Sequence, residues 1–133
     1  MNGVKIMRQV IHTEAGALPG GPYSQAIVLN GVVYVAGQGS FVPGTTTFKP
    51  GSFEEQARQT FENIGVLLKA SGSSFAHVVK VGVFLTNLNH FAALNQVYQE
   101  FFSAPYPVRT TIQAGLSGNM LIEVDCIAEV STK

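Results

Sequence analysis

Two predicted strands near the C-terminus carry the residues with the most evident chemistry. Alternation along residues 108–114 and 121–130 puts polar side chains on one face of each strand: Arg109, Thr111 and Gln113 on the first, Glu123 and Asp125 on the second. If the two strands form a hairpin that turns near Ser117–Gly118, these side chains lie on the same side of the sheet. We expect that side to be buried, where an isolated charge is costly unless it is paired or used.

A structural explanation stands beside the functional one. Arg109 could form a salt bridge across a subunit interface, and Thr111 could be an ordinary polar residue facing a barrel. For Asp125, a role as a cap or an ion-pair partner is favoured over a catalytic role. The residues alone leave these alternatives open. Metal and cofactor sites are not expected, because the three histidines are dispersed without ligand spacing. No loop of the kind that cradles phosphate and no nucleophile elbow is present.

The order of predicted elements indicates an α+β protein. The expected strands are residues 4–11, 24–29, 32–36, 77–85, 108–114 and 121–130, and the expected helices run from Ser52 to about 71 and from about 89 to 102. Asn30-Gly31 predicts a hairpin turn between the second and third strands, and Ser52 with Glu55 forms a capping box. We expect one domain over residues 1–133, with a single mixed six-stranded sheet and both helices packed on one face.

The composition favours an oligomeric protein that binds neither nucleic acid nor a membrane. Charged residues make up 12% of the chain and hydrophobic ones 46%, so a charge-poor surface indicates cover by another subunit. The second face of the sheet is also apolar, which favours self-association. Eight basic residues balance eight acidic ones without the basic patch that nucleic acid needs. The N-terminus does not read as a secretory signal, no apolar run is long enough to span a bilayer, and Cys126 has no partner for a disulfide. A cytoplasmic protein is therefore expected.

Several segments together resemble the RidA (YjgF-like) family of imine deaminases. They are Gly21-Pro22-Tyr23-Ser24-Gln25-Ala26, Gly37-Gln38, Asn95 with Tyr98 and Phe101-Phe102, Pro107-Val108-Arg109-Thr110, and Ile122-Glu123-Val124-Asp125-Cys126-Ile127-Ala128. The resemblance implies a chorismate-mutase-like fold and a homotrimer whose sheets form a central barrel, with sites in the clefts between subunits. It also implies a carboxylate-bearing imine or enamine substrate, of the 2-aminoacrylate or 2-iminopropionate type, hydrolysed to a 2-keto acid and ammonia.

The same resemblance assigns roles to individual residues. Arg109 matches the residue that binds the substrate carboxylate, and its planar guanidinium suits that task. Glu123 matches the acidic residue that positions or deprotonates water. The other assigned positions are Tyr23 lining the cleft, Gly37 and Thr111 presenting backbone amides, and Phe91 and Asn95 on the pocket wall. Without the family, Tyr23 would be a half-buried aromatic, Gly37 a turn glycine, Phe91 a core residue and Asn95 a solvent-facing one.

Two departures from the family pattern bear on activity. Ala36 stands where a serine is common, and Thr111 stands where a cysteine is common, with Cys126 expected on the other side of the sheet. Ala36, together with altered loops at Leu116-Ser117 and through Phe41 and Lys49, motivates an alternative: a catalytically weak member of the same fold that binds small carboxylates such as keto acids as a sensor. The ribonuclease and translation-inhibitor activities reported for relatives supply a third interpretation, against which the neutral charge balance argues.

Overall fold

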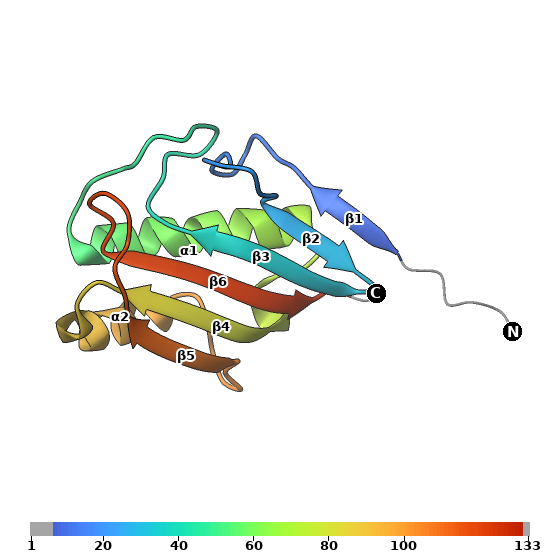
Figure 1. Cartoon of the computed structure of the whole chain (residues 1–133). Coiled ribbons are helices and arrows are strands. Elements are labelled where there is room, and N and C mark those ends of the chain that lie inside the picture. Colours follow the sequence, from blue (N-terminus) through green and yellow to red (C-terminus); the bar gives the residue numbers. More distant parts are fainter. Residues whose placement is uncertain (1–6, 132–133) are drawn as a thin grey trace, which may run out of the picture.

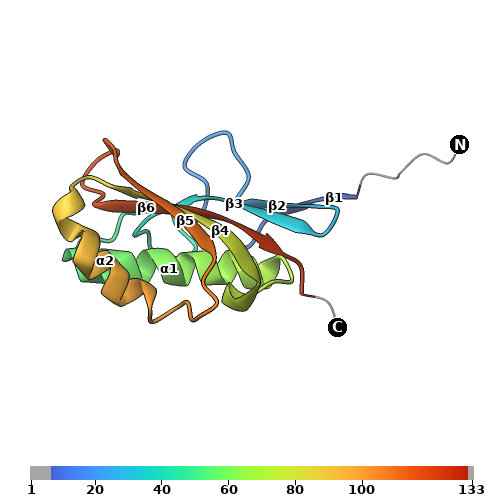
Figure 2. The same cartoon turned by 90° about the horizontal axis from the view of Figure 1, so that it is seen from below.

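The computed structural model of the chain describes residues 7–131. A six-stranded mixed sheet has both α-helices on one face, as Figures 1 and 2 show from two directions, and this confirms the predicted α+β architecture. In chain order the elements are β1 (Arg8–Ile11), β2 (Ala26–Leu29), β3 (Val32–Gln38), α1 (Phe53–Ala70), η1 (Phe75–His77), β4 (Val78–Leu85), η2 (Leu88–His90), α2 (Phe91–Tyr98), β5 (Val108–Gln113) and β6 (Ile122–Glu129), where η marks a 3₁₀ helix. The first residues of the predicted strand 4–11 lie outside the described residues.

The strand order in the sheet is β1-β2-β3-β6-β4-β5. All neighbours are antiparallel except β4 and β5, which are parallel. The predicted hairpin between the last two strands is therefore wrong, because β4 lies between them. β4 has four valines among its eight residues and is apolar on both faces, and such a strand is typical of a position with neighbours on both sides. The more polar β5 takes the edge (Figure 1).

Local sequence signals explain the hairpin and the start of the first helix. The turn between β2 and β3 uses Asn30 and Gly31, both at positive φ, as an Asn-Gly hairpin requires. At the start of α1, the Ser52 hydroxyl accepts a hydrogen bond from the Glu55 N–H, and the Glu55 carboxylate accepts one from the Ser52 N–H. The predicted capping box is thus confirmed, and it fixes where the chain enters the helix.

The second helix is shorter than predicted. α2 ends at Tyr98 rather than at residue 102, and the N–H groups of Phe101 and Phe102 both donate to the Tyr98 carbonyl. This turn directs the two phenylalanines toward α1, where both rings lie within 6.0 Å of the Phe61 ring centre. Aromatic packing therefore overrides the helical periodicity of the sequence at this point.

The hydrophobic core fills the space between the helices and one face of the sheet. Its fully buried side chains include Phe61 and Leu67 of α1 and Val81 and Val83 of β4. Strict alternation along 77–85 would place Val79 on the same face as Val81 and Val83. Val79 is instead 42% exposed, because the β4–β6 register shifts between Val78 and Lys80. No helix among residues 7–131 is long and apolar enough to cross a membrane.

The other face of the sheet carries large apolar side chains in the single chain. Tyr34 is 46% exposed, Val108 66% and Ile112 44%, and all three point away from the helices in their registers. Exposed apolar side chains on neighbouring strands mark an association surface. This face is compatible with the expected self-association.

Candidate active site

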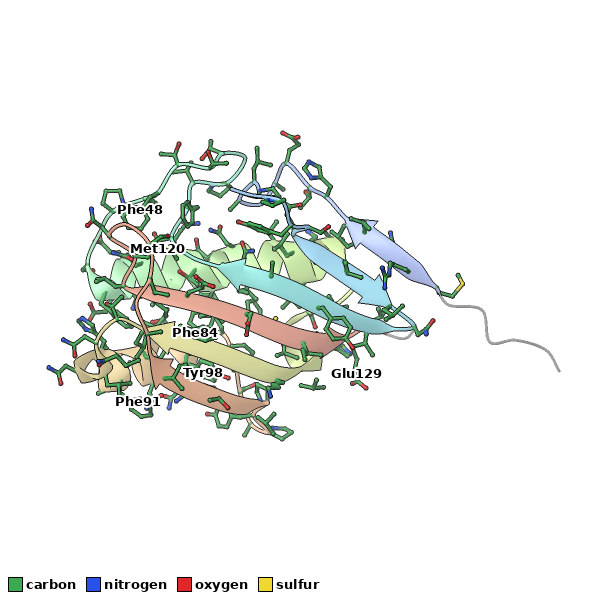
Figure 3. The ribbon with its side chains drawn as sticks, viewed as in Figure 1. Phe48, Phe84, Phe91, Tyr98, Met120 and Glu129 are labelled. Carbon is green, nitrogen blue, oxygen red and sulfur yellow. The ribbon has the colours of Figure 1, made fainter. Side chains whose placement is uncertain are left out.

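Arg109 lies on the helix-facing side of the edge strand β5, opposite the fully buried Val81 of β4. Its Nη2 donates a hydrogen bond of 2.9 Å to Oδ1 of Asn95. Its guanidinium carbon lies 4.7 Å from the ring centre of Tyr98 and 5.5 Å from that of Phe91. We call Arg109 and these three α2 residues the arginine half-site; Figure 3 labels Phe91 and Tyr98 beside β5. Next to it is a pocket of about 310 Å³.

The charge of Arg109 is not neutralised by a carboxylate within the described part of the chain, where the two ion pairs are His12–Glu14 and Arg58–Glu100. Its neighbours are an amide oxygen and two aromatic faces, all uncharged. These groups orient the guanidinium without cancelling its charge. Because one Nη is bonded to Asn95, the other N–H groups remain for a ligand. A planar cation held in this way suits a carboxylate.

Thr111 is on the same side of β5 as Arg109, two residues further along the strand. The Ala114 N–H donates to the Leu85 carbonyl of β4. Successive N–H groups point to opposite edges of a strand, so the N–H of Thr111 points to the outer edge, where no described strand pairs with β5. The Thr111 hydroxyl is buried without a hydrogen-bond partner. A free backbone donor therefore lies beside Arg109.

Glu123 points to the other side of the sheet. In the β4–β6 register it is opposite Phe84, which faces away from the helices (Phe84 is labelled in Figure 3). Its carboxylate lies directly over Gly37 of β3, and a Cβ at Gly37 would overlap it. Burial raises the pKa of Glu123 above its ordinary value of 4.5, and the negative charge of Asp125 contributes in the same direction. Glycine at position 37 thus makes room for a carboxylate with enhanced basicity.

A cleft of about 410 Å³ opens beside Glu123 and Gly37. Tyr23, on the loop before β2, lines it and is 53% exposed. Its hydroxyl oxygen accepts a hydrogen bond of 3.0 Å from the Gly20 N–H, which leaves the phenol O–H free to donate to a ligand or water. We call Glu123, Gly37 and Tyr23, with this cleft, the glutamate half-site.

The two half-sites occupy opposite faces of one sheet. Arg109 and Cys126 both pair with Val81, so Arg109 shares a face with Cys126 and not with Glu123. Figure 2 shows both helices on one side of the sheet and the loop between β1 and β2 rising from the other. The expectation that Arg109 and Glu123 share a side is wrong, because it assumed that β5 and β6 are neighbours. The sheet itself separates the two groups within one chain.

Asp125 and Cys126, which follow Glu123 on β6, pack against β4 and the core respectively. The Asp125 carboxylate lies over Gly82, and burial raises the pKa of Asp125. Cys126 faces the helices, on the side of Arg109, contrary to expectation. Burial raises the pKa of its thiol to about 12, so Cys126 is a neutral core residue at physiological pH.

The segment after β3, which borders the cleft, is tied to α1 by buried amides. Asn63, fully buried, donates to the carbonyls of Gly39 and Phe41 at 3.1 and 3.0 Å. Lys49 donates to Oε1 of Gln59 at 3.2 Å, and Gln59 in turn donates to Asn63. Sequence analysis did not identify these positioning residues. Their signal was a stripe of amide side chains at helical spacing on an otherwise apolar face.

A family described as endoribonuclease L-PSP has a sequence model that matches residues 14–130. The chain belongs to this family. It is the RidA/YjgF family that the sequence segments resemble. The match spans both half-sites, from Tyr23 in the first loop to Glu123 in β6.

Individual relatives agree over most of the chain. Reactive Intermediate Deaminase A, chloroplastic, of Arabidopsis thaliana is 40% identical over 124 residues, which are 92% of this chain and 66% of that protein. The 2-iminobutanoate/2-iminopropanoate deaminase of Capra hircus is 37% identical over 92% of this chain and 90% of its own. The crystal structure of E. coli TdcF with bound serine is 35% identical and matches with a TM-score of 0.85, covering 92% of this chain and 99% of that one. The fold is that of RidA proteins.

Proposed function

We propose that this protein hydrolyses 2-imino acids and their enamine tautomers to 2-keto acids and ammonia. The observation that carries the proposal is the uncompensated Arg109 guanidinium, held by Asn95 and two aromatic rings with donors to spare. A carboxylate is the ligand such a group takes. Deaminase names among the relatives support the reaction type.

The proposed reaction site is shared between subunits of a homotrimer. The two half-sites face opposite sides of the sheet, so one chain does not bring both to a small substrate. In the proposal, each cleft combines the arginine half-site of one subunit with the glutamate half-site of the next. The exposed apolar face of the sheet supports such an assembly. Light scattering at micromolar concentration should give the mass of a trimer, and a monomer mass would contradict the shared site.

The chemistry follows from the two charges. Arg109 binds the substrate carboxylate, a charge-assisted contact worth roughly 1.5–3 kcal/mol. Glu123 of the partner subunit accepts a proton from water as the water oxygen bonds to C2 of the protonated imine, which gives a neutral carbinolamine. Glu123 then returns this proton to the carbinolamine nitrogen. The C–N bond breaks as the hydroxyl oxygen forms the C=O bond of the keto acid, and the released ammonia takes up the hydroxyl proton as ammonium. A raised pKa makes Glu123 a better base, because a carboxylate closer to neutral pH drives proton transfer more strongly.

The remaining predicted residues take supporting roles. The Tyr23 phenol orients water or substrate, and the Gly37 and Thr111 backbone amides hold the ligand. Phe91 and Asn95 form the wall around Arg109.

Keto-acid release from 2-aminoacrylate tests the reaction. The enamine is generated in situ by a pyridoxal-phosphate serine dehydratase, with semicarbazide trapping the imine that escapes hydrolysis. Wild type should accelerate pyruvate release, and both Arg109→Ala and Glu123→Gln should abolish the acceleration. Arg58→Ala is the matched control, because its guanidinium is already paired with Glu100. No acceleration by wild type over several imino acids would contradict the deaminase.

Two other interpretations remain distinguishable. Retained keto-acid binding without turnover would indicate the carboxylate-binding sensor. Ala36, which stands where a serine is common in the family, favours this alternative. The family description names an endoribonuclease; RNA cleavage that is lost in Arg109→Ala protein would support that activity.

A cytoplasmic location is part of the proposal, although the Arabidopsis relative is described as chloroplastic. Imaging of a tagged protein in its own cell would test this location.

A further inference from the structure

Tyr98 is the most enclosed member of the arginine half-site. It is 5% exposed, whereas Phe91 is 43% exposed. The Arg109 guanidinium carbon lies 4.7 Å from the Tyr98 ring centre, closer than its 5.5 Å to Phe91. Tyr98 therefore supplies the inner face against which the cation rests, and Phe91 the outer rim.

The ring of Tyr98 is itself held on two sides. Phe102 stacks on it with ring centres 4.4 Å apart and planes 24° apart. Phe61, fully buried in α1, meets it edge-on at 5.7 Å and 83°. A ring clamped by one stacked and one perpendicular neighbour has little freedom to tilt. It offers Arg109 a fixed surface rather than an adaptable one.

Asn95 and Tyr98 act on the guanidinium in different directions. They are three residues apart on α2 and so occupy the same helix face. Asn95 accepts a hydrogen bond in the plane of the cation, whereas the Tyr98 ring presents its face to the guanidinium carbon. The hydrogen bond limits rotation of the guanidinium within its plane, and the ring limits its tilt. The N–H edge that a carboxylate needs stays free.

The Tyr98 hydroxyl does not take part in this contact. It is buried and has no hydrogen-bond partner among the described residues. Burial raises the pKa of Tyr98 to about 12, so the phenol stays protonated at neutral pH. An unbonded buried hydroxyl adds nothing to stability, which leaves the ring face as the part of this side chain with a role at Arg109.

We propose that Tyr98 is the positioning residue for the carboxylate-binding arginine, and that its ring face sets the plane in which Arg109 meets the ligand. The inference rests on the proposed role of Arg109 in binding carboxylates. It extends that role to the buried aromatic ring on which the guanidinium rests.

Binding and NMR measurements on three variants of the trimer test the inference. The variants are Tyr98→Phe, which keeps the ring, Tyr98→Leu, which removes it, and Phe75→Leu. The last is the control, because Phe75 packs against Phe101 and Phe102 of the same aromatic cluster rather than against Tyr98. Calorimetric Kd for 2-oxobutanoate should stay within about twofold in Tyr98→Phe and Phe75→Leu. It should weaken about 3- to 30-fold in Tyr98→Leu, the factor equivalent to a cation–π contact, with KM for the imine rising more than kcat falls.

A ligand-free readout separates this inference from the proposed function. The side-chain methylene protons of Arg109 should show an upfield ring-current shift in wild type and Tyr98→Phe, and lose much of it in Tyr98→Leu. Equal losses of affinity in Tyr98→Leu and Phe75→Leu, or an unshifted Arg109 in wild type, would overturn the inference. An inactive wild type with the shift and the Kd series intact would overturn the deaminase but leave the role of Tyr98 standing.

Discussion

Replacement of Arg109 by glutamine removes the charge that should bind the ligand while leaving the fold nearly unchanged. No carboxylate pairs with Arg109 in the described chain, so the change leaves no opposite charge unpaired, and Asn95 is partly exposed and can bond to water. The lost interaction is one charge-assisted contact of roughly 1.5–3 kcal/mol. Because 1.4 kcal/mol corresponds to about tenfold in affinity, the Kd for 2-oxobutanoate should rise about 10- to 150-fold.

Arg58→Gln is the matched control for this experiment. It removes the same charge, but the Arg58 guanidinium already donates two hydrogen bonds of 2.8 and 2.7 Å to Glu100. Isothermal titration calorimetry with 2-oxobutanoate should give a Kd within about twofold of wild type for Arg58→Gln. Arg109→Lys should lie between, because lysine keeps the charge but lacks the planar fork. Equal weakening by the Arg109 and Arg58 changes would refute carboxylate recognition by Arg109.

Three further predictions concern the glutamate half-site and its support. If Glu123 acts as the base, kcat/KM should fall as pH drops through its raised pKa, with the acid limb above pH 4.5; a profile that stays flat down to pH 4.5 would exclude this role. Gly37→Ala should reduce turnover at least about 100-fold, because its methyl group overlaps the Glu123 carboxylate, whereas Gly115→Ala, with open space around its Cβ, should not; similar rates for both would contradict the close contact. Asn63→Ala should lower the free energy of unfolding by about 2–4 kcal/mol, because two buried carbonyls lose their donor; urea titration with an unchanged midpoint would show that these bonds are not needed.

Local patterns in the sequence predict the elements but not their pairing. Alternation, the Asn30-Gly31 turn and the Ser52 capping box each act over a few residues, and each has its expected outcome. The apolar run of β4 indicates a central strand, but strand order depends on contacts between distant segments, and no local pattern places β4 between β5 and β6. The bulge near Val79 has no local sequence signal either. Its effect is large, because a shift of one residue moves the preceding side chains of the strand to the opposite face of the sheet.

The candidate site was predictable in residue type more than in arrangement. The resemblance identified Arg109 and Glu123, and each has a partner set that suits its proposed role. Their separation onto opposite faces follows from the parallel pairing of β4 and β5, which residue patterns do not encode. Tyr98 and Asn63 act through other residues, so their sequence signature is that of ordinary core and helix positions.

Subunit mixing tests most directly whether each cleft takes Arg109 from one chain and Glu123 from another. Arg109→Ala and Glu123→Gln chains, each inactive alone, would be co-expressed in equal amounts, and the whole population of trimers would be assayed for keto-acid release. A shared site predicts about one quarter of wild-type activity, because random assembly supplies both intact halves to about one cleft in four. Wild type mixed with the double variant should give the same quarter. No activity in the first mixture and about half in the second would place both residues in one chain's site and contradict the shared cleft.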